Sequence, residues 1–112
     1  MVKREALLAY RVEVFKALAD PTRLEIVEFL RDGEKCVCEI IPAMGKAQST
    51  VSKHLEILHR AGILDRRVDG KRVLYRIKDP ILLKILKSVD DLILNRLIPL
   101  AKTLKVLKVA KR

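Results

Sequence analysis

The sequence GKAQSTVSKHLEILHR, residues 45–60, carries the pattern that decides the fold. Read at a helical period, Val51, Leu55 and Leu58 fall on one face, at positions i, i+4 and i+7. The other face bears hydroxyl, amide and ammonium groups and suits a DNA major groove, because glutamine pairs with adenine edges while serine and lysine reach bases or phosphates. An ordinary solvated amphipathic helix is the alternative. The candidates for DNA contact on this helix are Gln48, Ser49, Thr50, Ser52 and Lys53.

Composition and charge limit the class of protein. The 112 residues are 50% hydrophobic but only 4% aromatic, which predicts one domain with an aliphatic core of packed helices. The net charge of +10 indicates a polyanionic partner. Residues 1–45 carry 7 basic and 8 acidic side chains, residues 46–78 carry 9 and 3, and residues 99–112 carry 5 and none. The positive charge is therefore concentrated in two blocks, and the first begins at the amphipathic helix.

The N-terminus and the apolar runs bear on localisation. The first 15 residues are interrupted by charges and lack the continuous apolar core of a signal peptide. No apolar run approaches the ~20 residues that a membrane span needs. We therefore expect a soluble, cytoplasmic protein with no membrane partner.

Helix signals precede the amphipathic stretch. Residues 3–18 show apolar side chains at helical spacing, and Asp20-Pro21 then provides an N-cap followed by proline at the first helical position. The second helix is expected to run to about residue 31, and a short third helix to end at Gly45. The second-helix residues expected in the core are Leu24, Leu30 and either Val27 or Ile26.

After residue 63 the apolar period changes from helical to alternating. The sequence LDRRV, then Asp69-Gly70, then KRVLYRI predicts a β-hairpin with Asp69-Gly70 as its two-residue turn. This register places Arg67 opposite Arg72, and like charges opposite each other destabilise a hairpin unless a polyanion lies over them. Phosphate contact is favoured over a solvated surface. The same register pairs Val68 with Lys71 and Leu64 with Tyr75, with Leu64, Val68, Val73, Tyr75 and Ile77 on one face and Arg67, Arg72 and Arg76 on the other.

The last segment carries more apolar surface than one small core can cover. Asp79-Pro80 signals a helix start, and Pro99 should kink or end that helix. An exposed stripe of this size predicts a partner subunit, most simply in a two-fold homodimer. The stripe comprises Leu82, Leu86, Val89, Ile93, Leu97 and Leu100, widened by Leu83, Leu94 and Ile98. Beyond it Lys102, Lys105, Lys108 and Lys111 alternate with Leu104 and Leu107, as an extra nucleic-acid or acidic-partner contact or as a solubilising tail.

Together these elements predict a mainly α winged helix-turn-helix in the order ααααββα, with the helix-turn-helix at 37–60 and the wing at 63–77. Three stretches, ALADPTRLEIVEFL with the pair CVC, STVSKHLEILHRAGIL, and the hairpin RRVDGKRVLYRI, resemble the ArsR/SmtB type of metal-sensing repressors. The resemblance spans about residues 12–80. It implies a homodimeric repressor, with residues 1–18 and 80–112 at the dimer interface, that leaves its operator when an inducer binds.

A two-fold dimer makes specific demands on its DNA. The two copies of the central helix would enter successive major grooves about 34 Å apart, so an inverted-repeat operator is expected. Phosphate contacts are expected to make binding weaken steeply with salt. The phosphate candidates are Lys46, Arg60, Arg66, Arg67, Lys71 and Arg72.

The cysteine pair is the candidate effector site. Cysteines two apart make a poor structural disulfide, so Cys36 and Cys38 are interpreted as ligands or redox groups. KCVCEI resembles the arsenic-responsive motif of the family, and soft thiolates suit As(III), Sb(III) and soft divalent ions. Because Pro42 cannot donate to the carbonyl of Cys38, the regular helix should begin at or after Cys38 and leave the pair in an easily reshaped lead-in.

Two departures from the family pattern restrict this prediction. Some arsenic sensors of this type have a third cysteine where this chain has Ile41, so a third ligand would be a water, a small thiol or nothing. The last helix offers Asp90 and Asp91 but no histidine, which argues against a zinc site there. The pair of His54 and His59 suggests no shared catalytic or metal site, and we expect no enzyme.

Three other functions remain open. The cysteines could make the chain a thiol-redox or sulfide-responsive repressor, in which an intersubunit disulfide is the expected product. They could instead be inert in a chain that binds DNA constitutively. From another class, the basic surfaces could belong to a winged-helix module that binds acidic proteins.

Overall fold

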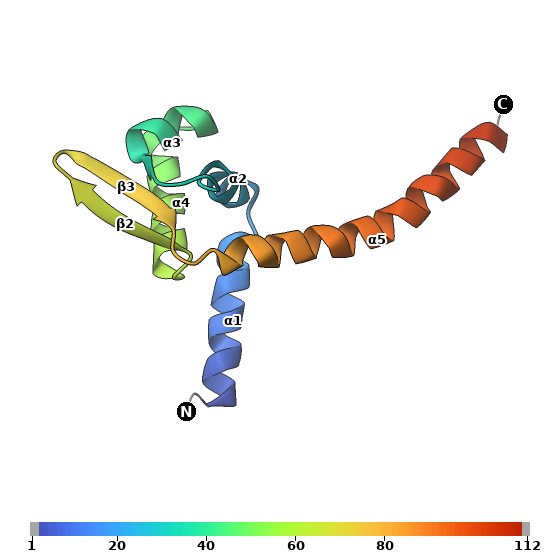
Figure 1. Ribbon diagram of the computed structural model, residues 1–112, viewed down its shortest axis with the longest axis horizontal. Coiled ribbons are helices and arrows are strands. Elements are labelled where there is room, and N and C mark those ends of the chain that lie inside the picture. Colours follow the sequence, from blue (N-terminus) through green and yellow to red (C-terminus); the bar gives the residue numbers. More distant parts are fainter. Residues whose placement is uncertain (1–2, 111–112) are drawn as a thin grey trace. The chain divides into compact units, whose positions relative to one another are not determined.

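The computed structural model describes residues 3–110, and the side chains of residues 3–105. Its elements follow the order α1, α2, β1, α3, α4, β2, β3 and α5. Figure 1 labels all of them except the two-residue strand β1. Their bounds are α1 Arg4–Leu18, α2 Pro21–Phe29, β1 Lys35–Cys36, α3 Val37–Met44, α4 Gln48–Arg60, β2 Leu64–Asp69, β3 Arg72–Ile77 and α5 Ile81–Ala110. The chain divides into two compact units, Met1–Asp79 and Pro80–Arg112. That residues 1–112 act as one domain stays a prediction.

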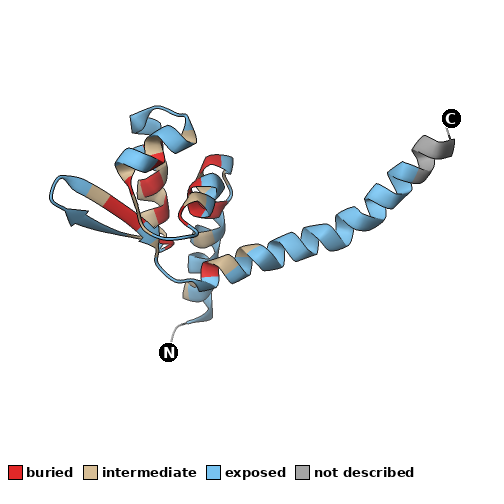
Figure 2. Cartoon of the chain, turned by 45° about the horizontal axis from the view of Figure 1, so that its top comes forward, coloured by how far each residue is buried: buried red, intermediate tan, exposed pale blue. Residues whose placement is uncertain are grey.

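The core of the first unit lies among α2, α3 and α4. Val51, Leu55 and Leu58 of α4 are buried, as the helical spacing predicts (Figure 2). Ile40 of α3 is also fully buried. The prediction for α2 is wrong at Leu24, which is 40% exposed, because the core-facing side of that helix is set by its other apolar residues. Those residues are Ile26, Val27 and Leu30.

Helix starts and stops follow the sequence signals closely. Asp20 caps α2 by accepting a hydrogen bond from the backbone N–H of Arg23 at 3.0 Å, with Pro21 at the first helical position. Gly45 ends α3 in the left-handed conformation, at φ 63°. Ala47 precedes α4 without any side-chain cap, so α4 depends on packing for its position.

The hairpin forms, but its predicted register is wrong by two residues, because the turn lies one residue further along the chain. Asp69 pairs with Arg72 and Val68 with Val73, so Gly70 and Lys71 occupy the turn. Gly70 takes a φ of 63° at the first turn position, where a type II′ turn needs a positive value. In this register the oppositely charged Asp69 and Arg72 face each other, and the apolar Val68 and Val73 face each other. The predicted division of side chains between the two faces is unaffected.

The observed register gives two of the predicted pairs different partners. Arg67 lies opposite Leu74 rather than Arg72, and Leu64 lies opposite Ile77 rather than Tyr75. In this register no two residues of like charge lie opposite each other. The register therefore gives no reason to expect a polyanion over the wing.

The sheet has a third strand that the sequence does not reveal. β1 pairs with β3 in antiparallel fashion, with Lys35 opposite Tyr75 and Cys36 opposite Leu74, in the order β1-β3-β2. Two residues are too short to show an alternating pattern. β1 matters because it attaches the cysteine segment to the wing, residues 63–77, through the backbone.

The second unit is the single helix α5. It continues through Pro99 to Ala110, so of the two predicted effects of this proline, a kink or an end, the helix end does not occur. Most of its described apolar side chains are exposed, among them Leu92, Ile93 and Leu97 (Figure 2). Among the described residues, no helix is long and apolar enough to cross a bilayer. Of the predicted lysine-rich tail, Lys111 and the side chains of Leu107 and Lys108 lie outside the described residues.

Candidate nucleic-acid interface and cysteine groove

The polar candidates on α4 form an exposed surface at its N-terminal half. Gln48, Ser49, Thr50, Ser52 and Lys53 are all exposed, in contrast to the buried apolar side of the helix. No side chain caps the first N–H groups of the helix. This surface has the donors and acceptors needed for contacts with base edges and phosphates. That it contacts DNA stays a prediction.

A groove of about 470 Å³ joins three of the predicted sites. Gln48 and Ser52 of α4 line it on one side, and the cysteine pair and the wing complete it. The groove does not include Ser49, Thr50 or Lys53. The fold therefore places the candidate effector residues beside part of the candidate DNA surface. The other lining residues are Cys36, Val37, Cys38, Arg66, Lys71, Arg72, Val73 and Tyr75.

The cysteines lie at the junction of β1 and α3. Cys36 has extended backbone, at φ −71° and ψ 146°, and serves as N-cap of α3. The helix starts at Val37, one residue before the predicted limit. Pro42 removes only the N–H that would donate to the carbonyl of Cys38. The carbonyl of Val37 can still accept from the N–H of Ile41 in the α-helical pattern. The predicted lead-in is thus confined to Cys36.

The two sulfurs are joined in a disulfide, contrary to the expectation for cysteines two apart. The Cα atoms of Cys36 and Cys38 lie 5.0 Å apart, within the range that a disulfide spans. The extended backbone at Cys36 turns its side chain toward that of Cys38, which a regular helix would not do. Cys36 is buried, with 2% exposure, whereas Cys38 is exposed.

Glu34 forms an ion pair with Arg67, one of the residues predicted to contact phosphate. Arg67 donates to both carboxylate oxygens of Glu34, at 2.8 Å from Nε and 2.7 Å from Nη2. The hydrogen bond from Arg67 lowers the pKa of Glu34, and the same interaction raises the pKa of Arg67. Arg72 reaches Oε1 of Glu39 at 3.5 Å. Two arginines of the wing therefore pair with carboxylates on either side of the cysteine pair.

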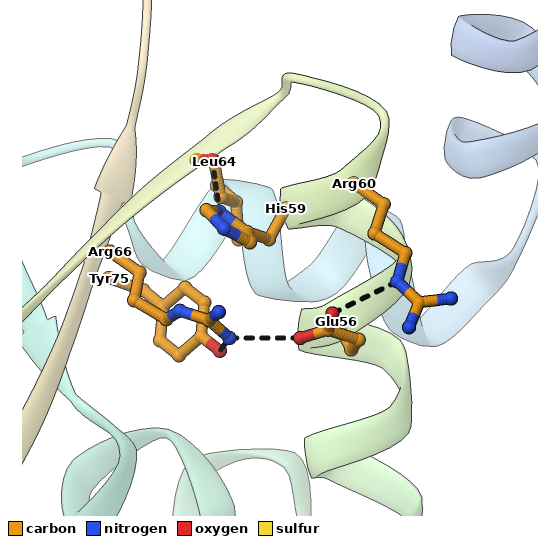
Figure 3. A network of polar contacts seen from close by, with 6 residues as sticks. All are labelled: Glu56, His59, Arg60, Leu64, Arg66 and Tyr75. Carbon is orange, nitrogen blue, oxygen red and sulfur yellow. Dashed lines mark hydrogen bonds and ion pairs between the residues drawn. The ribbon is translucent and has the colours of Figure 1, made fainter.

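A second network joins the wing to α4 (Figure 3). Arg66 donates to Glu56 at 2.9 Å, and Arg60 donates to the other oxygen of the same carboxylate at 3.0 Å. Both hydrogen bonds lower the pKa of Glu56, and the one from Arg66 has the larger effect. The pKa of Arg66 is raised mainly by its hydrogen bond to the Tyr75 hydroxyl, with Glu56 next. Both arginines are thus anchored by Glu56.

Arg60 lies apart from the other candidates. It follows Gln48 by 12 positions on α4, a rise of about 18 Å. It lines a separate hollow of about 660 Å³ between α1 and the end of α4, together with Tyr10 and Gly62. Arg60 therefore lies away from the groove, and its contact with phosphate stays a prediction.

Both histidines of α4 make polar contacts with other elements. Nδ1 of His54 lies 3.1 Å from Nη1 of Arg23, whose Nε donates to the carbonyl of Ala17 at 2.6 Å. His59 reaches the carbonyl oxygen of Leu64 at 3.1 Å and packs edge-on against Tyr75. Each histidine connects α4 to a neighbouring element.

The described residues contain no group of three or more His, Cys, Asp or Glu side chains that could hold a metal ion. The soft donors are the sulfurs of Cys36 and Cys38, which could share one ion only after reduction. Glu34, Glu39 and Glu56 were not predicted as site residues from the sequence. The spacing i, i+4 could have revealed the pair of Glu56 with Arg60, but Glu34 and Arg67 are 33 positions apart and meet only in the fold.

Comparison with known proteins gives consistent matches. The family model for the bacterial regulatory protein, arsR family, matches residues 20–66. An uncharacterised HTH-type transcriptional regulator of Methanocaldococcus jannaschii is 47% identical over 81 residues, covering 71% of this chain and 91% of the relative. The arsenical resistance operon repressor of Escherichia coli is 41% identical over 81 residues, covering 71% and 69%.

Solved structures of other proteins also match this chain. A homodimeric winged helix-turn-helix DNA-binding domain from Mycobacterium bovis, a possible ArsR-family transcriptional regulator, has 33% identity and a TM-score of 0.74, covering 82% of this chain and 86% of that one. Reduced HlyU from Vibrio cholerae has 30% identity and a TM-score of 0.67, covering 76% and 93%.

Proposed function

Since the chain belongs to the ArsR family of bacterial regulatory proteins, we propose that it is a DNA-binding transcriptional repressor whose effector site is the cysteine pair. It acts as a homodimer on an inverted-repeat operator, with α4 in the major groove and the wing on the phosphates. The chemistry is binding and release, and no catalytic step is involved.

The observation that supports this proposal is the shared groove. Cys36 and Cys38 lie against Gln48 and Ser52 of α4 and against the basic side chains of the wing. A change at the sulfurs therefore occurs next to the residues proposed to contact DNA. Coupling of about 1–3 kcal/mol between the two sites is enough for a usable response.

The proposed inducer is As(III), Sb(III) or a soft divalent ion, bound by the reduced thiolates of Cys36 and Cys38. The similarity to an arsenical resistance operon repressor supports As(III). Chelation constrains the junction of β1 and α3, which tilts α3 and moves α4 out of register with the groove of the DNA. The inducer must bind the DNA-incompetent state more tightly for this to work.

Titration of As(III), Cd(II) and peroxide into a complex of the reduced protein with operator duplex tests this mechanism. We expect As(III) to release the DNA, and a Cys36→Ser, Cys38→Ser double variant to bind the same DNA without responding. A double variant that still releases its operator on addition of As(III) would refute the assignment of the inducer site. Random duplex in a salt series provides the control for DNA binding itself.

A second candidate function is supported by the disulfide between Cys36 and Cys38. In a thiol-redox repressor, oxidation to this disulfide within one chain would be the switch, in place of the intersubunit bond expected from the sequence. In the titration above, release by peroxide alone would identify this mode. Retention of DNA by the oxidised protein would exclude it.

A further inference from the structure

The groove beside the cysteine pair has a strongly cationic wall. Arg66, Lys71 and Arg72 line it, and no acidic residue of the described chain is among its lining residues. Arg66 and Arg72 have carboxylate partners elsewhere, but Lys71 takes part in no described ion pair. At about 470 Å³ the groove falls in the size range of small-molecule sites. A small anion therefore has both room and counter-charge next to the sulfurs.

The two sulfurs in this groove are not equivalent. Cys38 is exposed, whereas Cys36 is only 2% exposed. The Sγ of Cys36 also accepts a hydrogen bond from the backbone N–H of Cys38 at 3.0 Å. A nucleophile from solvent therefore reaches Cys38, and negative charge that develops on Cys36 finds a donor already in place.

We propose that the groove is a binding and modification site for an anionic low-molecular-weight thiol. The thiolate sulfur of the small molecule bonds to Sγ of Cys38, the bond between the two protein sulfurs breaks, and its electron pair leaves on Cys36. A second small thiol then attacks the mixed disulfide. It releases the oxidised small disulfide and leaves Cys38 as a thiolate, so two small thiols supply the two electrons that reduce the pair.

The modification has a direct consequence for the groove. The adduct on Cys38 places an anionic group beside Gln48 and Ser52, where the proposed function puts DNA. Reaction of the thiol itself does not require DNA binding or a metalloid inducer. The two proposals can therefore fail separately.

The charge preference of the reaction provides the test. Oxidised protein is mixed with glutathione, whose thiolate form carries a net charge of about −2, or with 2-mercaptoethanol, whose thiolate carries no other charge. The mixtures are quenched with acid and analysed by mass spectrometry. We expect the first adduct on Cys38. Lys71→Ala with Arg72→Ala should slow the reaction with glutathione about tenfold at low salt. It should slow the reaction with 2-mercaptoethanol much less, because the attacking thiolate is the only charge on that molecule.

A matched variant, Lys16→Ala with Lys78→Ala, removes two positive charges that do not line the groove and should react with glutathione like the wild type. The wild-type chain gives a second measurement that needs no substitution: the ratio of the two rates should fall as salt is raised. Equal slowing with both thiols, equal slowing by the matched variant, a first adduct on Cys36, or a salt-independent ratio would each overturn the proposal.

Discussion

Arg67 is held by Glu34 through two hydrogen bonds of 2.7 and 2.8 Å, and both side chains are partly exposed. A guanidinium held in this way must leave its carboxylate before it contacts a phosphate. The basic residues of the wing therefore differ in availability, although the sequence presents them as equivalent.

Glu34→Gln should strengthen binding to duplex DNA, because it leaves Arg67 without its ionic partner. We expect a gain of about two- to fivefold, the effect of one exposed ion pair, and a salt slope steeper by about one. Fluorescence anisotropy across a salt series measures both. Glu28→Gln, which removes a partner of Arg31 from α2, is the control and should change neither. Weaker binding by Glu34→Gln would show that the ion pair supports the DNA-binding form.

Asp20 contributes to stability through its cap. Asp20→Ala should lower the free energy of unfolding by about 1 kcal/mol, since the backbone N–H of Arg23 loses its acceptor. Asp32→Ala, at an exposed position in the loop after α2, should have little effect. Urea denaturation followed by circular dichroism measures both.

The same aspartate predicts a pH dependence. The backbone hydrogen bond from Arg23 lowers the pKa of Asp20 below its ordinary value of 3.8. The stabilisation from the ionised cap is therefore present above that value and is lost as the pH falls through the lower pKa of the folded state. We expect the stability difference between wild type and Asp20→Ala to shrink in this acidic window. A difference that stays constant throughout the acidic titration would contradict an ionic contribution.

Among the elements, α4 is well determined by its sequence on its buried side and poorly determined at its start. Its three apolar residues define which face is buried, but Ala47 offers no side chain to satisfy the first N–H groups. The helix is therefore placed by its neighbours, α2 and α3, more than by its own signals.

Ala47→Ser should stabilise the protein by about 0.5–1 kcal/mol, because serine can accept a hydrogen bond from the first turn of α4. Thermal unfolding provides the measurement. Ala61→Ser, at the other end of the same helix, serves as the control and should not raise the melting temperature. An unchanged melting temperature for Ala47→Ser would mean that the N-terminal groups of α4 are already satisfied.

The register of the wing and the presence of β1 could not be predicted from the sequence. The alternation of apolar residues predicts two strands and their faces, but the register depends on which residue takes the positive φ. Gly70 can occupy either turn position, and the pairing of Asp69 with Arg72 favours the observed one. β1 was missed because its two residues gain their strand character only from contact with β3.

For the whole molecule, the fold class, the order of the main elements and the family follow from the sequence. Helix periodicity and caps are local signals, so they could be recognised without coordinates. The groove could not be predicted, because it brings together residues 36–38, 48–52 and 66–75 from separate elements. The ion pairs of the wing were hidden for the same reason.

The exposed apolar side chains of α5 support the predicted homodimer. Ile93→Glu with Leu97→Glu should convert the dimer to a monomer, because it places charges in the apolar stripe. Sedimentation equilibrium measures the mass. Lys84→Glu with Lys87→Glu, at exposed positions on the opposite side of the same helix, is the matched control and should stay dimeric. If the first double variant also stays dimeric, the interface lies elsewhere.

Cys36 is at once the last residue of β1 and the N-cap of α3. Its backbone is paired opposite Leu74, while its side chain supports the first turn of the following helix. Chemistry at this one sulfur therefore loosens or tightens a strand and a helix together. Hydrogen–deuterium exchange should detect this as correlated changes in amide protection at the start of α3 and along β3, whichever effector reacts with the cysteine pair.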